Sequence, residues 1–98
     1  DLFTKLLAAD NDNVEMHFAL GQLFRRRGEV DRAIHRHQHM LARPQLEKNY
    51  RQQALLALGR DYLHAGMLDR AERVFQELSK SEPYRSESLH QLLSIYEQ

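Results

Sequence analysis

The sequence predicts an all-α protein, a helical solenoid built from repeated helix pairs. The main observation is a pattern of small, apolar and charged residues that occurs twice, first as Leu20-Gly21-x-x-Phe24 with Gly28 and Asp31-Arg32-Ala33, then as Leu58-Gly59-x-x-Tyr62 with Gly66 and Asp69-Arg70-Ala71. The second observation is that Gly and Pro are few, four and two, so little of the chain is broken into turns. Internal repetition of this length is typical of stacked structural units. Such arrays mostly present an extended surface to a partner.

Helical periodicity divides the chain into six expected helices, over residues 1–9, 14–27, 30–42, 46–65, 68–80 and 85–97. Asn13 is a suitable N-cap for the second of them. Gly28 and Gly66 can adopt the left-handed conformation that closes a helix. Pro44 and Pro83 end the third and the fifth, because a proline ring clashes with an upstream carbonyl.

The two copies differ in spacing by four residues. Phe24 and Tyr62 are 38 residues apart, whereas Tyr62 and Tyr96 are 34 apart. The extra residues, near 45–49, are expected to add one turn to the front of the fourth helix, since four residues are close to one helical period.

Two glycines stand in the middle of expected helices. Gly21 and Gly59 each cost about 1 kcal/mol relative to Ala. We expect the paired helix to cross closely there, with Ala33 and Ala71 as the facing small residues. The remaining space between helices is expected to be filled by Leu20, Phe24, Leu58, Tyr62, Val74, Phe75 and Leu78.

The second copy resembles the tetratricopeptide repeat family. It carries the Leu-Gly-x-x-Tyr, Gly, Ala-x-x-x-Phe and Pro signature at Leu58, Gly59, Tyr62, Gly66, Ala71, Phe75 and Pro83. The first copy departs from it at His37, where a large apolar residue is usual, and His37 is expected to be a part-buried packing residue. The resemblance implies one segment over residues 1–98, composed of the end of a preceding repeat (1–9), two repeats (14–44 and 46–83) and the first helix of a further repeat (85–98).

A narrower resemblance, to the bacterial lipopolysaccharide assembly protein B family, covers nearly the whole chain. It rests on the stretches Leu20-Gly21-x-Leu23-Phe24-Arg25-x-Arg27-Gly28-Glu29-Val30-Asp31-Arg32-Ala33-Ile34-His35-x-His37-Gln38, Leu58 to Tyr62, Ala65-Gly66, Asp69 to Glu72 and Gln91-Leu92-Leu93-x-Ile95-Tyr96. Members have an N-terminal membrane helix, cytoplasmic repeats and a C-terminal rubredoxin-like zinc domain. The resemblance implies a segment on the cytoplasmic side of the inner membrane, without catalysis or cofactor of its own and with the anchor and the zinc domain outside it. The implied role is that of an adaptor that helps an inner-membrane ATP-dependent protease degrade the deacetylase committing precursors to lipid A. A repeat scaffold that binds an unrelated peptide or protein partner is the alternative.

Composition limits the classes of partner. Basic and acidic side chains number 14 each, which argues against a nucleic-acid partner. No apolar run is long enough to cross a bilayer, so we expect no direct membrane contact from this segment. The absence of cysteine excludes disulfides and fits a reducing compartment. Half-repeats at both ends are expected to leave apolar faces uncovered, which favours self-association.

In tetratricopeptide arrays the concave side is lined by the first helix of each pair. Carried onto this sequence, the partner-binding positions are Phe18, Gln22, Arg25, Arg26, Leu56, Arg60, Leu63 and His64. We expect them to form a groove for an extended or helical peptide with acidic and apolar side chains. An ordinary solvated face remains the alternative. Arg25 and Arg60 are expected to point away from the core between paired helices.

Three histidines suggest a metal site, which the sequence only weakly supports. His35 and His39 are one helical turn apart and share a face. A zinc site needs a third or fourth ligand, and we expect none to join these two histidines. We therefore expect no metal in this segment. No phosphate-binding loop or nucleophile motif is present either, and we expect no enzyme activity.

Overall fold

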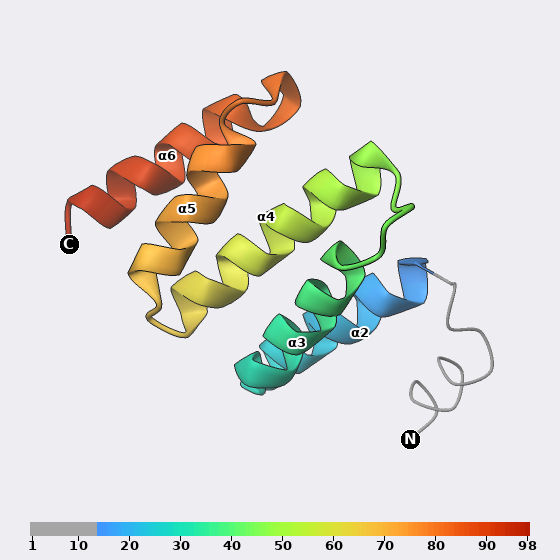
Figure 1. The fold of residues 1–98 in the computed structure, drawn as a ribbon. Helices are drawn as coiled ribbons and strands as arrows, with labels where there is room; N and C mark the ends of the chain where they lie inside the picture. Colours follow the sequence, from blue (N-terminus) through green and yellow to red (C-terminus); the bar gives the residue numbers. More distant parts are fainter. Residues whose placement is uncertain (1–13) are drawn as a thin grey trace.

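The computed structural model describes residues 14–98 as an all-α array of antiparallel helices (Figure 1). The helix expected over 1–9 and the N-cap expected at Asn13 lie outside the described residues. The observed elements are α2 (Val14–Arg26), α3 (Val30–Leu41), α4 (Lys48–His64), α5 (Leu68–Leu78), a short 3-10 helix (Glu82–Tyr84) and α6 (Arg85–Tyr96). The order and approximate bounds of these helices confirm the predicted fold class.

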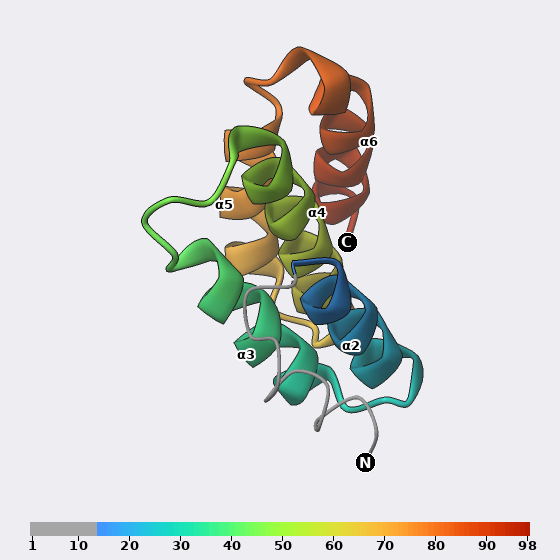
Figure 2. The ribbon, with the colours of Figure 1, turned by 90° about the vertical axis from the view of Figure 1, so that its right-hand side faces the viewer.

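The helices form two successive pairs followed by a single helix. α2 packs against α3, α4 against α5, and α3 and α5 each also contact the first helix of the next unit. Figure 2 shows α3 and α5 along one side of the array and α2, α4 and α6 along the other. None of the helices within residues 14–98 combines the length and the apolar character that a bilayer crossing requires.

Both pairs turn in the same way at glycine. Gly28 has φ 81° and Gly66 has φ 74°, values that residues with a Cβ rarely adopt. The Glu29 amide donates to the carbonyl of Phe24 at 2.8 Å, and the Met67 amide donates to that of Tyr62 at 2.9 Å. Each of these backbone hydrogen bonds joins the first and the last of six consecutive residues. It satisfies a carbonyl that the end of the helix leaves without a partner.

The four inserted residues lengthen α4, as predicted. α4 has 17 residues, whereas α6, the first helix of the following unit, has 12. The extra turn starts at Lys48, two residues later than expected, because the chain after Pro44 stays non-helical as far as Glu47.

The mid-helix glycines are sites of close approach. A Cβ on Gly59 would lie 2.7 Å from Cζ of Phe75, and a Cβ on Gly21 would meet the ring of His37 in the same way. His37 and Phe75 are therefore structural equivalents, each an aromatic ring laid on the backbone of the partner helix. Ala33 and Ala71 are fully buried.

The apolar core runs from α3 to α6. It contains Ile34, Leu58, Tyr62, Ala71, Phe75, Leu78, Leu92 and Ile95, with Val74 packed against it. On α6 the apolar residues Leu89, Leu93 and Tyr96 are exposed instead. Leu93 follows Gly59 by 34 residues, so the third copy has a large side chain where the first two have glycine.

Candidate functional site

The candidate site is an open depression of about 510 Å³ between α2 and α4. Helical periodicity places its lining on one face of each helix, at spacings of three and four residues. α2 contributes Glu15, Phe18, Gln22 and Arg25, and α4 contributes Asn49, Tyr50, Gln53, Leu56, Ala57 and Arg60.

The structure brings together five of the eight concave-face residues predicted from the sequence. Phe18, Gln22, Arg25, Leu56 and Arg60 line the depression. The other three, Arg26, Leu63 and His64, do not line it. Arg26 and His64 are exposed, and Leu63 packs against the core cluster.

Aromatic rings form one wall of the depression. The ring centroids of Phe18 and Tyr50 are 6.4 Å apart with a tilt of 40°, within the range of favourable aromatic pairs. Phe18 is also 6.4 Å from the ring of His37 behind it. The apolar wall is therefore continuous with the buried interior.

Behind this wall lies a polar cluster that the sequence interpretation missed. Asp61 and His37 both have fully buried side chains. Because a carboxylate only accepts, His37 Nδ1–H donates to Asp61 Oδ2, at 2.5 Å. The second carboxylate oxygen of Asp61 accepts from Arg25 Nη1 at 3.3 Å. His37 Nε2 has no partner among the described residues.

The expectation that Arg25 points away from the core is wrong. Its side chain is only 16% exposed, and its guanidinium reaches from the depression to the buried Asp61. His37 is also more deeply buried than expected, because the polar contact with Asp61 replaces the apolar packing of the other copy.

The buried position of Asp61 could have been predicted by comparing the repeat copies with one another. The matching residues are Leu23, 38 positions earlier, and Ile95, 34 positions later. A carboxylate at an otherwise apolar repeat position, next to a copy with His37 at another apolar position, indicates a compensating pair.

The other groove arginine is also paired. Arg60 Nη2 lies 2.7 Å from Glu87 Oε1 of α6, and both side chains are partly exposed. Each arginine that lines the depression thus has a carboxylate partner on a later part of the chain.

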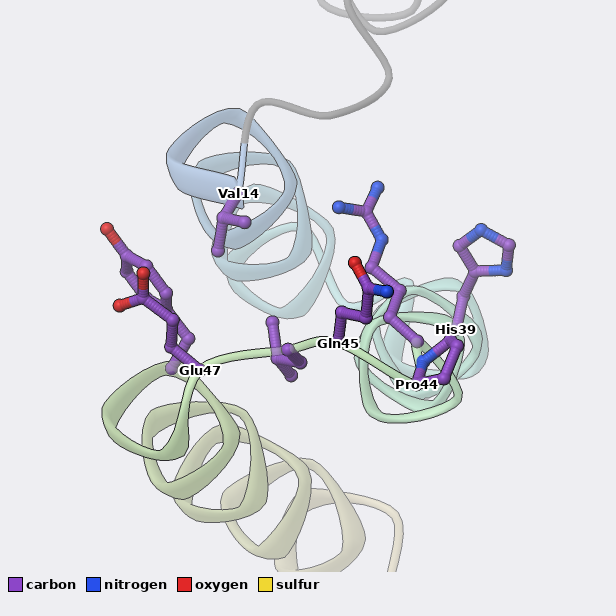
Figure 3. A pocket seen from close by; sticks show the side chains of 8 residues that line it. Val14, His39, Pro44, Gln45 and Glu47 are labelled. Carbon is purple, nitrogen blue, oxygen red and sulfur yellow. The ribbon is translucent and has the colours of Figure 1, made fainter.

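A second hollow, of about 520 Å³, lies beside the N-terminus of α2 and the loop from α3 to α4. Figure 3 shows Val14 pointing toward this loop, which carries Gln45 and Glu47. Its charged groups are of opposite sign, and Arg43 already lies 3.2 Å from His17 Nε2, so we assign it no ligand.

The histidines do not assemble a metal centre within residues 14–98. No three His, Asp or Glu side chains there are grouped so that they could hold one ion. His35 and His39 are exposed on α3, whereas His37 points into the core.

Comparison with known proteins agrees with the repeat architecture. Residues 17–49 match the family model described as tetratricopeptide repeat. The chain is 47% identical over 97 residues to lipopolysaccharide assembly protein B of Escherichia coli strain K12. The aligned region covers 99% of this chain and 25% of the relative. Lipopolysaccharide assembly protein B of Haemophilus influenzae is 38% identical over 109 residues, covering 99% of this chain and 26% of the relative. The chain thus spans about a quarter of the length of these curated relatives.

Proposed function

We propose that this chain is the protein-binding segment of an adaptor in lipopolysaccharide biosynthesis. The proposal is supported by the match of residues 17–49 to the tetratricopeptide repeat model and by the similarity of nearly the whole chain to lipopolysaccharide assembly protein B. The observation that carries the proposal is the open depression between α2 and α4, in which apolar, amide and arginine side chains from two repeats face one space. An extended surface of this kind, shared between repeats, suits the binding of a protein segment.

The finer proposal follows the family resemblance. The segment would recruit the deacetylase of the lipid A pathway to an inner-membrane ATP-dependent protease and so lower the supply of lipid A precursors. It would act on the cytoplasmic side of the inner membrane, with the anchor outside these residues. The volume of the depression and the chemistry of its lining support a role in holding a segment of one of these partners.

The test is capture of the purified deacetylase and protease by the full-length protein. Gln22 and Gln53 are exposed and line the depression from opposite helices, so Gln22→Trp/Gln53→Trp fills it without touching the core. We expect capture of at least one partner to fall about tenfold or more, as for loss of a hot spot. Gln76→Trp on α5, outside the depression, is the matched control and should bind as the wild type does.

Circular dichroism has to show that both variants are folded. If the filled variant captures both proteins with wild-type affinity, the depression is not the partner site. If neither protein binds even the wild type, the proposed role in lipopolysaccharide biosynthesis fails.

A further inference from the structure

The charges around the depression are balanced within the chain. Arg25 is paired with the buried Asp61, and Arg60 with Glu87. Glu15 is the one carboxylate among the residues given above as the lining of the depression. An acidic partner side chain would have to share an arginine with a carboxylate already in place, and like charges at close range are unfavourable.

Arg25 nonetheless retains hydrogen-bonding capacity. A guanidinium has five N–H donors, and among the described residues Arg25 uses one, toward Asp61. Asp61 lies behind the guanidinium in the core, so we take the remaining N–H donors to be on the side that faces the groove. The buried carboxylate cancels the charge of Arg25 and leaves it a fixed donor of hydrogen bonds.

The neighbouring groups have matching chemistry. Gln22, Asn49 and Gln53 present amides to the same depression, and an amide both donates and accepts. This is the pattern that a peptide main chain satisfies with its alternating carbonyl and N–H groups. Phe18 and Leu56 add apolar surface for the side chains between them.

We infer that the groove binds an extended, uncharged and partly apolar segment through its main chain, and that the buried Asp61 is the positioning residue that makes Arg25 a donor to a main-chain carbonyl. This inference deepens the proposed function. It rests on that proposal in one respect, namely that the groove is the partner site. It differs from the acidic partner segment expected from the sequence, because that expectation counted the arginines without their carboxylate partners.

The test is selection from a random peptide library displayed on phage, with the full-length protein as bait. Peptides that bind in the groove are those whose binding is weakened by Gln53→Ala and not by Gln76→Ala. We expect these peptides to carry Asp and Glu at no more than the library frequency. Their affinity, measured by fluorescence polarisation, should change by less than about twofold between low and high salt, because no net charge is neutralised on binding.

Asp61→Asn gives the decisive comparison. Asn keeps the shape and an oxygen that can accept from Arg25, but it removes the charge that balances the guanidinium. The groove peptides selected by this variant should be enriched in Asp and Glu by about twofold or more, with a salt dependence that a purely structural residue would not produce. Glu87→Gln, which frees the charge of Arg60 at a partly exposed site, should act in the same direction and replaces Asp61→Asn if that variant does not fold.

Three outcomes would overturn the inference: acidic peptides selected by the wild type, no peptide whose binding depends on Gln53, or an unchanged charge preference in the folded Asp61 or Glu87 variant. Failure of the proposed function is separate. Peptides that are uncharged and groove-dependent, together with a deacetylase and a protease that do not bind, would support the chemistry of the groove and exclude the proposed partners.

Discussion

The contact between His37 and Asp61 leads to a prediction about stability. Asp61→Leu installs the type of residue that Leu23 provides at the matching position of the first copy. It removes the only acceptor that His37 Nδ1–H has within residues 14–98, in a place where both side chains are 0% exposed. An orphaned buried donor costs about 1–3 kcal/mol.

Arg25 also loses its carboxylate in this variant. Its side chain is 16% exposed and borders the open depression, so water can solvate it in part. The cost of breaking a fully buried ion pair, about 3–5 kcal/mol, is therefore an upper limit. We expect Asp61→Leu to lower the free energy of unfolding by about 3 kcal/mol, the sum of the orphaned donor and part of the lost pair.

The double replacement His37→Phe/Asp61→Leu should recover the part of this loss that comes from the orphaned donor of His37. Phenylalanine on glycine is the packing that Phe75 makes on Gly59, and Gly21 leaves the same space for the ring at position 37. Replacement of a buried polar pair by apolar residues of similar size is often neutral, but Arg25 stays without its carboxylate in the double variant. We therefore expect the double variant to remain about 1–2 kcal/mol less stable than the wild type.

The assay is urea unfolding of the wild type, both single variants and the double variant, followed by far-ultraviolet circular dichroism. A coupling energy of about 2 kcal/mol or more should emerge from the cycle. Losses in the single variants that simply add in the double variant would refute the account, as would an Asp61→Leu protein as stable as the wild type.

Three other features make predictions. Gly59→Leu should lower stability by about 1–3 kcal/mol through overpacking against Phe75, with Gln53→Leu on the exposed face as a control in thermal melts; equal melting temperatures would remove the close-approach argument. The 98-residue chain on its own should self-associate through the exposed apolar face of α6, and Leu93→Lys should shift it toward monomer in light scattering; a wild-type chain that stays monomeric at high concentration would contradict this. His35 and His39 should bind zinc no more tightly than micromolar in calorimetry, since no third ligand joins them among the described residues, and tight stoichiometric binding would show that a ligand has been overlooked.

Local signals were enough to predict the helices. Gly28 and Gly66 end helices where the chain must reverse, and both close with the same backbone bonds. The longer α4 followed from the repeat spacing alone, because an insertion of one helical period keeps Leu58 on the same face. These properties depend on residues close to one another in the sequence.

The polar cluster could not be predicted in this way. His37 and Asp61 are 24 residues apart and lie on helices of different repeats. Whether a carboxylate at position 61 is solvated or buried depends on the helix packed across from it. The sequence interpretation expected Arg25 to point away from the core and therefore assigned it no carboxylate partner. The carboxylate that balances Arg25 belongs to the next unit.

The same contact has a consequence for how a gene of this kind can change. Tandem repeats recombine, and loss of one unit leaves the reading frame intact. Deletion of α4 and α5 would bring α6 against α3, where Ile95 would occupy the position of Asp61 and leave His37 Nδ1–H facing a hydrocarbon side chain. The two units are therefore not interchangeable, and the polar contact preserves both the number and the order of repeats against slippage that an all-apolar array would tolerate.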